Sequence, residues 1–204
     1  MTFVAKKSLG QNFLNDTKVI KIIAELGKID NNDLILEVGA GTGNLTEKIL
    51  EQSPKKLFVI EKDQRLALYL NEKFGDKINI FNEDMMKFEY ERYYKDKLII
   101  FGNLPYNIST QILAKWIRIK NLDSFCKKFI LMFQKEVADR IIAETNTKNY
   151  GRLSILSNWK MKIDKIISNK GNLISGPLLI KPDLIIDERG FFFESWNRRL
   201  FDDV

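Results

Sequence analysis

Four consecutive residues, Asn103-Leu104-Pro105-Tyr106, combine the groups that chemistry on an amino group of a planar ring requires. The exocyclic N6 of adenine is a poor nucleophile because its lone pair is delocalised into the ring. The Asn103 side-chain oxygen and a backbone carbonyl near Leu104 can accept hydrogen bonds from the amino protons and favour the charge that develops during attack. Pro105 stiffens the turn, and Tyr106 offers a flat face for an extruded base. We take these four as candidate catalytic residues, although a strand followed by a proline turn with a packed tyrosine explains them equally well.

A glycine-rich loop follows the apolar run Leu34–Val38. The loop, Gly39-Ala40-Gly41-Thr42-Gly43, leads into a helical pattern from Asn44. Glycines are needed where backbone approaches a ligand closely. In a Gly-x-Gly-x-x-Gly dinucleotide loop the third glycine would come one residue later, and here Glu37 precedes the loop. The spacing therefore predicts S-adenosylmethionine rather than NAD as the cofactor.

Two further acids follow later apolar runs. Glu61 ends the run Leu57–Ile60, at roughly the distance of about 20 residues beyond the loop where an acid can take both ribose hydroxyls. Asp84 follows the run Ile78–Phe81 and can accept from the adenine amino group of the cofactor. A solvent-facing acid at a strand end is the ordinary explanation for either one alone. Together with Glu37 they predict a cofactor site.

The elements that must position these residues alternate between strand and helix. The pattern predicts an α/β fold with a doubly wound, Rossmann-like parallel sheet. The predicted strands are 34–38, 57–60, 78–81, 97–101 and 128–133, and the predicted helices begin near residues 16, 44, 63 and 109. Open sheets of this kind bind ligands at the carboxyl ends of their strands. Because Gly39, Glu61, Asp84 and Asn103 all follow predicted strands, cofactor and base are expected at one edge of the sheet.

Composition limits the function classes. The 204 residues include 33 Lys and Arg against 27 Asp and Glu, a net charge of +6 that suits a phosphate-rich partner. The absence of His excludes imidazole catalysis and histidine metal sites, and we expect no metal. The single Cys126 excludes an internal disulfide and suits a reducing compartment. With no apolar stretch of transmembrane length and no signal-peptide core, the expected location is the cytoplasm.

The chain resembles the ribosomal RNA adenine dimethyltransferases of the small subunit, which dimethylate N6 of two adjacent adenosines in a hairpin near the 3′ end of that RNA. Several segments carry the resemblance, and they fall in the family's order. They are Leu9–Leu14, Leu36–Thr46, Val59–Glu61, Glu83-Asp84, Gly102–Ser109, Gln134–Arg140 and Tyr150–Ser154. The combination is far more specific than any one motif.

The resemblance implies roles for individual residues. Asn12, Leu14, Gly39, Glu61, Asp84 and Asn103 would line the S-adenosylmethionine site. Asn103 to Tyr106 would hold the target adenine. The implied fold is the S-adenosylmethionine-dependent methyltransferase domain, and the implied partner is small-subunit rRNA in a pre-ribosomal particle, bound by a monomer. The reaction would be direct in-line displacement at the sulfonium methyl, aided by alignment and exclusion of water.

Other functions remain open at this point. The antibiotic-resistance dimethyltransferases of large-subunit rRNA share a similar turn, but the Asn-Leu-Pro-Tyr-Asn form and Gln134–Val137 favour the small-subunit enzymes. A DNA adenine-N6 methyltransferase would usually bring a target-recognition region, and an NAD-dependent oxidoreductase is disfavoured by the loop spacing. The main competitor is a methyltransferase-fold assembly factor that binds rRNA while methylating weakly or not at all.

The basic residues and phenylalanines near the motifs have ordinary explanations as well. Lys127, Lys128, Lys135 and Arg140 can track RNA phosphates, but solvated charge at strand and helix ends is the commoner explanation. Phe13 and Phe133 are more consistent with packing than with base stacking.

The tail departs from the family pattern. We expect a core domain over residues 1–163 with an N-terminal arm, and a divergent tail over 164–204 that can complete the sheet with a strand at Leu184–Ile186. The family's Phe-x-Pro-Pro-Pro-Lys-Val-like segment and C-terminal helical domain are not recognisable here, and the tail carries an aromatic cluster at Phe191–Trp196. On this basis the expected dimethylation is slow while cofactor binding is retained.

Overall fold

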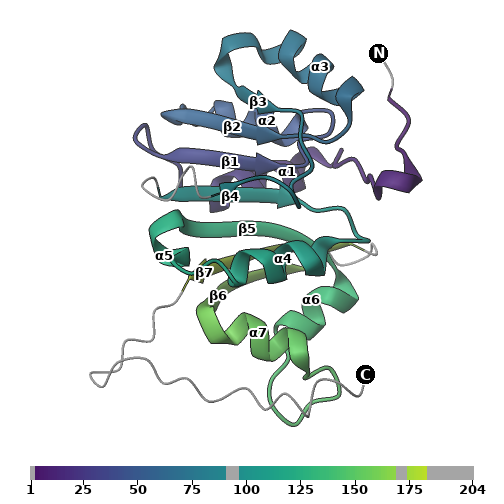
Figure 1. The fold of residues 1–204 in the computed structure, drawn as a ribbon, viewed down its shortest axis with the longest axis vertical. Coiled ribbons are helices and arrows are strands. Elements are labelled where there is room, and N and C mark those ends of the chain that lie inside the picture. The colour runs from purple at the N-terminus through teal and green to yellow at the C-terminus, as the bar shows by residue number, and fades with distance from the viewer. Residues whose placement is uncertain (1–2, 91–96, 169–173, 183–204) are drawn as a thin grey trace.

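The strands of the computed structural model form one sheet in the order β3-β2-β1-β4-β5-β7-β6. The structure describes residues 3–90, 97–168 and 174–182 (Figure 1). Within these ranges the strands are β1 (Leu34–Val38), β2 (Lys56–Ile60), β3 (Asn79–Phe81), β4 (Leu98–Asn103), β5 (Cys126–Gln134), β6 (Met161–Ser168) and β7 (Ile174–Pro182). The first five coincide with the predicted strands to within a few residues.

The chain order reverses at β1, which confirms the doubly wound α/β fold. Strand β1 pairs in parallel with β2 on one side and with β4 on the other, and β3 and β5 continue the parallel sheet outward. Such a reversal leaves a crevice at the carboxyl ends of the two central strands, where ligands of these folds bind. Strands β5, β7 and β6 then pair antiparallel, with Met161 opposite Pro182.

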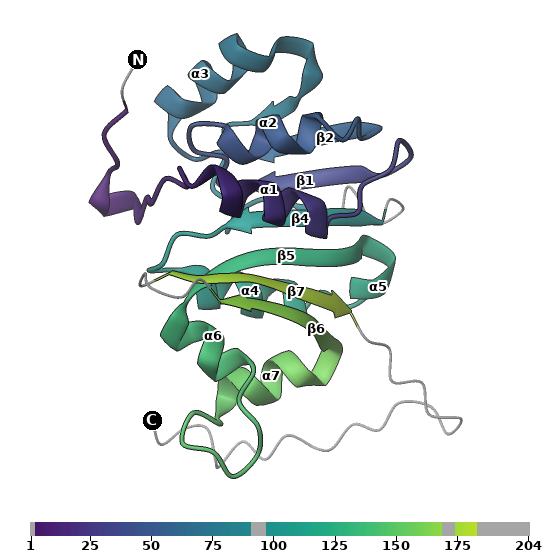
Figure 2. The same ribbon diagram turned by 180° about the vertical axis from the view of Figure 1, so that it is seen from behind.

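Helices cover both faces of the sheet, and the central strands are apolar on both sides. The helices are α1 (Thr17–Leu26), α2 (Asn44–Leu50), α3 (Gln64–Phe74), α4 (Ser109–Ile117), α5 (Leu122–Phe125), α6 (Lys135–Ile141) and α7 (Arg152–Lys160), with short 3-10 turns at Lys7–Leu9 and Gly75–Lys77. Ile35 and Ile99 pack with residues of α1, α2 and α3, and α1 and α2 lie in front of the sheet in Figure 2. The next residues, Leu36 and Ile100, pack with α4 to α7 on the opposite face. This period-two alternation explains why these strands have continuous apolar sequences.

The helix ends follow the polar signals in the sequence. The Asp16 side chain accepts from the backbone N–H groups of Lys18 and Val19 and begins α1. Asp63 accepts from the N–H of Arg65 and begins α3, which ends at Gly75 with a positive φ of 52°. Capping by a carboxylate satisfies backbone donors that have no partner within the helix. Asp63 is thereby fixed two residues beyond Glu61, at the carboxyl end of β2.

The second half of the chain departs from the sequence pattern. Residues 152–160 form α7, and the expected domain boundary at residue 163 falls inside β6, which pairs with β7. The strand predicted at Leu184–Ile186 and the aromatic cluster at Phe191–Trp196 lie outside the described residues. No helix in the described part of the chain is long and apolar enough to cross a membrane.

Candidate functional site

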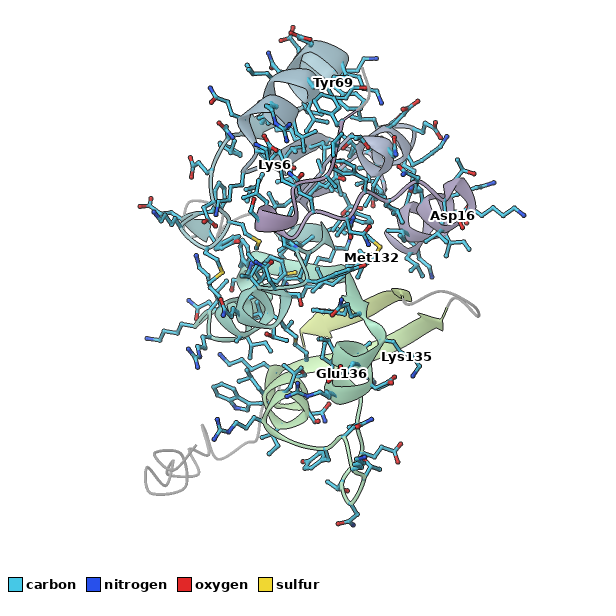
Figure 3. The ribbon with its side chains drawn as sticks, turned by 90° about the vertical axis from the view of Figure 1, so that its right-hand side faces the viewer. Lys6, Asp16, Tyr69, Met132, Lys135 and Glu136 are labelled. Carbon is cyan, nitrogen blue, oxygen red and sulfur yellow. The ribbon has the colours of Figure 1, made fainter. Side chains whose placement is uncertain are left out.

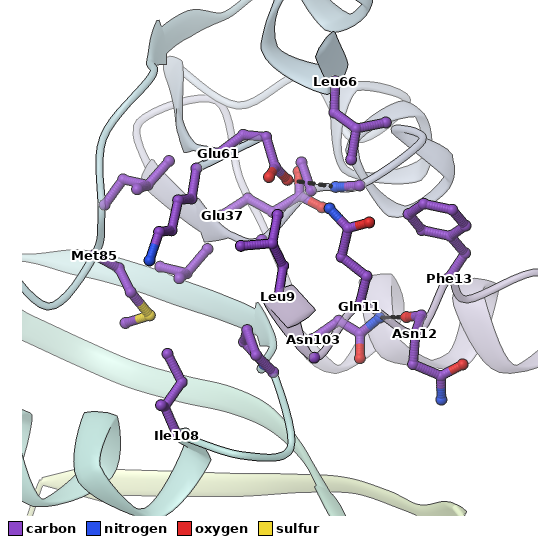
Figure 4. A pocket seen from close by; sticks show the side chains of 18 of the residues that line it. Leu9, Gln11, Asn12, Phe13, Glu37, Glu61, Leu66, Met85, Asn103 and Ile108 are labelled. Atoms are coloured by element: carbon purple, nitrogen blue, oxygen red, sulfur yellow. Dashed lines mark hydrogen bonds between the residues drawn. The ribbon is translucent and has the colours of Figure 1, made fainter. Parts of the chain in front are cut away.

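A pocket opens at the carboxyl ends of β1, β2 and β4, beneath the N-terminal segment (Figure 4). Residues from five segments line it: 8–14, 37–45, 60–66, 83–86 and 103–108. Some positions within these ranges, among them Asp63, Leu104 and Tyr106, do not line the pocket. We call residues 3–15 the N-terminal arm, Gly39–Gly43 with Glu61 the glycine-loop wall, and Asn103–Ile108 the proline-turn wall. The pocket therefore lies where the strand order reverses, as the sheet type predicts.

Backbone conformation requires the glycines of the glycine-loop wall. Gly39, Gly41 and Gly43 have φ angles of 75°, 59° and 78°, which side chains rarely allow. A Cβ on Gly39 would also lie 3.2 Å from the backbone oxygen of Asn103, and one on Gly41 would lie 3.2 Å from the Phe13 ring. The loop is thus closely flanked by the proline-turn wall and by the arm, and its backbone is open toward the pocket.

Glu37 is buried behind this loop. Its side chain accepts a 2.7 Å hydrogen bond from the Thr46 hydroxyl of α2, and the residue is 1% exposed. Burial raises the pKa of Glu37 to about 7, an effect that the Thr46 hydrogen bond reduces and the charge of Glu61 adds to. Glu37 therefore ties the end of β1 to α2 at the back of the pocket.

Glu61 is the acid of the glycine-loop wall that faces the pocket. Its Oε2 accepts from the N–H of Gly41 at 3.0 Å, and its Oε1 accepts from the N–H of Asp63 at 2.9 Å. Burial raises the pKa of Glu61, and these two backbone hydrogen bonds oppose the increase. The carboxylate is held in one orientation across the loop, at the position predicted for it.

Asp84 contributes to a third side of the pocket, in the segment after β3. Its carboxylate accepts from Lys62 Nζ at 2.9 Å and from the N–H of Met86 at 2.9 Å. The hydrogen bond from Lys62 lowers the pKa of Asp84. The acid is therefore ionised at neutral pH and fixes the turn that carries Met85 and Met86 into the pocket lining.

The proline-turn wall is held by the arm. Asn103 Nδ2 donates to the backbone oxygen of Asn12 at 2.8 Å, and Asn12 Nδ2 donates to the Tyr106 hydroxyl at 2.6 Å. Pro105 lines the pocket, whereas the Leu104 side chain is buried in the core beneath it. An amide whose nitrogen donates to Asn12 offers its oxygen as an acceptor. The turn and the arm thus form one hydrogen-bonded unit at the carboxyl end of β4.

The arm is anchored at several points. Phe3 packs edge-on against Tyr69 of α3 with ring centroids 4.9 Å apart, and Lys6 lies on the same side of the molecule (Figure 3). Gln11 Nε2 donates to Asp63 at 3.1 Å, and the Asn44 side chain donates to the Leu14 backbone oxygen at 2.8 Å. These contacts join the arm to α3 and α2.

Most of the residues predicted for the site come together in this pocket. Asn12, Leu14, Gly39, Glu61, Asp84, Asn103 and Pro105 line it. Tyr106 meets the arm through Asn12, and the roles assigned to all these residues remain predictions. Sequence patterns did not single out Met85, Met86 or Ile108, since apolar residues in loops carry no chemical signal. Asp63 was expected only to begin a helix, and its bond to Gln11 has no local signature.

The basic residues considered for RNA contact are partly engaged elsewhere. Lys127 Nζ pairs with Asp33 at 2.8 Å, and Lys128 is buried. Lys135 pairs with Asp139 within α6, away from Lys6 and the arm (Figure 3). Phe133 is fully buried in the core, and Phe13 packs at the pocket beside Gly41. In the described residues no group of three or more Cys, Asp or Glu side chains is arranged to hold a metal ion.

Comparisons with known proteins point to one family. The model of the family described as ribosomal RNA adenine dimethylase matches residues 2–178. The chain is 50% identical over 182 residues to the ribosomal RNA small subunit methyltransferase A of Pelagibacter ubique, covering 89% of this chain and 69% of the relative. It is 45% identical over 157 residues to the protein of the same name from Ehrlichia ruminantium, covering 74% of this chain and 58% of that relative.

Solved structures agree on the fold. A dimethyladenosine transferase from Plasmodium falciparum superposes with a TM-score of 0.70 at 29% identity, covering 85% of this chain and 64% of that one. The 23S rRNA methyltransferase ErmE superposes with a TM-score of 0.69 at 22% identity, covering 84% of this chain and 70% of that one, and so shows the fold alone. The chain spans less than two thirds of the Ehrlichia ruminantium relative and of the Plasmodium falciparum structure.

Proposed function

This chain belongs to the ribosomal RNA adenine dimethylase family, and on that premise we propose that it transfers methyl groups from S-adenosylmethionine to N6 of adenosine in rRNA. The proposed substrate is the pair of adjacent adenosines in the 3′-terminal hairpin of the small-subunit rRNA. The small subunit follows from the names of the relatives, and the pair of adenosines in the hairpin follows from the family resemblance of the Asn103-Leu104-Pro105-Tyr106 segment.

One observation carries the proposal: the backbone of Asn103 lies beside the glycine loop. The backbone oxygen of Asn103 lies 3.2 Å from the position that a Cβ on Gly39 would occupy. Since Nδ2 is committed to Asn12, the amide oxygen is the acceptor that an adenine amino group would meet. A base held by Asn103 would therefore lie next to a cofactor held by the glycine loop.

The residues of the glycine-loop wall fit S-adenosylmethionine. Each oxygen of Glu61 already accepts one backbone N–H, and a carboxylate oxygen can accept a second hydrogen bond from a ribose hydroxyl. Glycines at 39 and 41 let the backbone approach the ligand. Asp84, ionised and at the pocket edge, is our candidate for the adenine amino group of the cofactor.

Most of the catalytic work is positioning. When bound, S-adenosylmethionine would supply a methyl group on a sulfonium, and the neutral thioether would be the leaving group, so no protein nucleophile is required. Each transfer would also release one N6 proton to solvent. Asn103 and the Leu104 carbonyl accept from the amine, Tyr106 supports the base, and the walls exclude water. Because two methyl groups must be added to one nitrogen, Asn103 cannot depend on both amino protons throughout.

The finer partner assignments also belong to this proposal. We propose that the chain acts as a monomer on a pre-ribosomal small-subunit particle in the cytoplasm, without a metal. The comparisons do not favour an assembly factor that binds rRNA without methylating it, because the relatives are named methyltransferases and dimethyladenosine transferases.

The test uses small-subunit particles isolated without this modification. Incubation with S-adenosylmethionine should yield N6,N6-dimethyladenosine at two adjacent positions, detected by mass spectrometry of the 3′ fragment. Glu61→Ala should weaken cofactor binding by roughly 1.5–3 kcal/mol in calorimetry, since two charge-assisted hydrogen bonds are lost. The exposed Glu72→Ala of α3 is the matched control and should bind normally. Binding of NAD, or a particle bound but left unmethylated, would refute the proposal.

A further inference from the structure

The Asp63 carboxylate holds more partners than a helix cap needs. Its side chain is 2% exposed and accepts from Gln11 Nε2 at 3.1 Å and from Arg65 Nη2 at 2.7 Å, with Lys6 Nζ 3.5 Å away. The Arg65 hydrogen bond, with further help from Gln11, holds the pKa of Asp63 well below its usual range. Asp16, the corresponding cap of α1, is exposed and accepts only from backbone within its own turn in the described structure. Asp63 therefore does something besides capping α3.

Asp63 makes contacts in two directions, one through its side chain and one through its backbone N–H. Gln11 and Lys6 belong to the arm, whereas the backbone N–H of Asp63 itself donates to Glu61 Oε1 at 2.9 Å. The same residue thus holds the acid of the glycine-loop wall through its backbone and the arm through its side chain.

Asn12, the next residue of the arm, connects the arm to the proline-turn wall. Asn12 follows Gln11 directly, accepts from Asn103 Nδ2 at 2.8 Å and donates to the Tyr106 hydroxyl at 2.6 Å. Figure 4 shows Gln11 directed toward Glu61 and Asn12 beside Asn103. Because a trans peptide fixes adjacent Cα atoms about 3.8 Å apart, holding Gln11 restricts where Asn12 can lie.

We propose that Asp63 is a positioning residue that anchors the arm at Gln11 so that Asn12 orients Asn103 and Tyr106 for transfer. The inference rests on the proposed function for its catalytic consequence, but the anchoring itself does not require activity. Asp63 acts through Gln11 and Asn12, and it does not touch the base.

The first test measures the arm directly in the protein without cofactor. Amide hydrogen exchange of peptides covering residues 6–14 should become roughly tenfold faster in Asp63→Asn and in Gln11→Met, the size expected for losing a charged hydrogen bond. Gln11→Met leaves the α3 cap intact and so separates anchoring from helix stability. Asp16→Asn makes the same chemical change at the cap of α1 and should leave arm exchange unchanged. Unchanged exchange in Gln11→Met overturns the proposal, whatever Asp63→Asn does.

The second test asks whether the arm transmits its position to the other wall. Tyr106→Phe removes the hydroxyl that Asn12 reaches. If the arm acts as proposed, the loss of kcat in the double variant Gln11→Met with Tyr106→Phe is smaller than the product of the two single losses. Independent effects, multiplying within error, overturn the proposal. If the variants show the expected exchange changes but neither the parent chain nor any variant transfers methyl groups, the proposed function is refuted. The anchoring of the arm is then still supported by the first test.

Discussion

The two walls of the pocket are held in different ways. The glycine-loop wall is continuous with β1, α2 and β2. Its acid Glu61 is 6% exposed, and Glu37 behind the loop is 1% exposed. The proline-turn wall continues β4, but its key side chain Asn103 is only half-buried and bonds to Asn12, 91 residues earlier in the chain. One wall is built by the local chain, and the other is completed by a distant arm. Changes in the first should therefore affect stability and cofactor affinity, and changes in the second should affect turnover.

The most severe test of this contrast is Asn103→Ala. If the amide oxygen stabilises the amine only as it reacts, its removal should lower kcat by about 10²–10³-fold or more while stability and cofactor affinity stay near the parent values. Tritiated-methyl incorporation into small-subunit particles measures the loss. The control is Asn32→Ala, an exposed residue before β1. A near-normal rate of methyl transfer by the Asn103 variant would show that the Asn103 side chain does not act in the reaction.

The buried acid Glu37, behind the glycine-loop wall, should make the free energy of unfolding depend on pH. Burial raises the pKa of Glu37 in the folded chain to about 7, above its ordinary value of 4.5, so the folded chain binds the proton more tightly than the unfolded chain. The stabilising contribution is fully present below about pH 4.5 and is lost as pH rises through about 7, a change of about 3 kcal/mol. Glu37→Gln should remove this slope in urea unfolding measured from pH 4.5 to 8. Glu72→Gln should retain it, and a parent protein without the slope would contradict the burial argument.

Glycine substitutions compare the glycine-loop wall with the arm that holds the proline-turn wall, at similar backbone geometry. Gly43 and Gly10 have φ angles of 78° and 64°. A Cβ on Gly43 would lie 2.7 Å from both Leu70 and Phe74, which are buried in the core. At Gly10 the nearest atom is the side-chain oxygen of Asn107, an exposed residue that can rotate away, and the Pro105 Cβ lies 3.2 Å away. Gly43→Ala should cost roughly 2–4 kcal/mol of unfolding free energy, and Gly10→Ala about 1 kcal/mol. Equal costs in chemical denaturation would show that the arm is as integral to the fold as the loop.

The same division explains what the sequence could predict. Strands β1 to β5 are apolar runs between turn signals. Gly39 and Glu61 directly follow β1 and β2, Asp84 comes three residues after β3, and Asn103 ends β4, so fold and pocket edge could be inferred from local order. The bond from Gln11 to Asp63 joins residues 52 apart, and no local pattern specifies it. Helix α7 leaves Ile155 and Trp159 exposed, so its apolar periodicity is poor. Strands β6 and β7 were not predicted because β6 alternates Lys and Asp with apolar residues in a sequence that also suits a surface segment.

The smallest expected effect concerns Lys115, which connects the helix after the proline-turn wall to the segment after Asp84. Lys115 of α4 donates from Nζ to the backbone oxygens of Met86 at 2.8 Å and Phe88 at 3.2 Å, and it lies 4.9 Å from the centroid of the Tyr90 ring. These contacts fix the turn that brings Met85 and Met86 to the pocket. Because α4 follows the proline turn, either wall can be affected when this lysine is lost.

The comparison of the walls predicts that cofactor binding responds to this loss and that turnover does not. In Lys115→Met the aliphatic stem is kept and the charged donor is lost, so the segment after Asp84 should loosen and cofactor affinity should fall by about 1 kcal/mol, roughly fivefold in Kd. Turnover at saturating cofactor should stay unchanged, since Asn103 and Tyr106 are held by the arm and not by this lysine. Calorimetry and steady-state kinetics, with the exposed Lys120→Met as control, separate the two quantities. A fall in kcat with an unaltered Kd would mean that Lys115 supports the proline-turn wall instead, and the division between the walls would have to be redrawn.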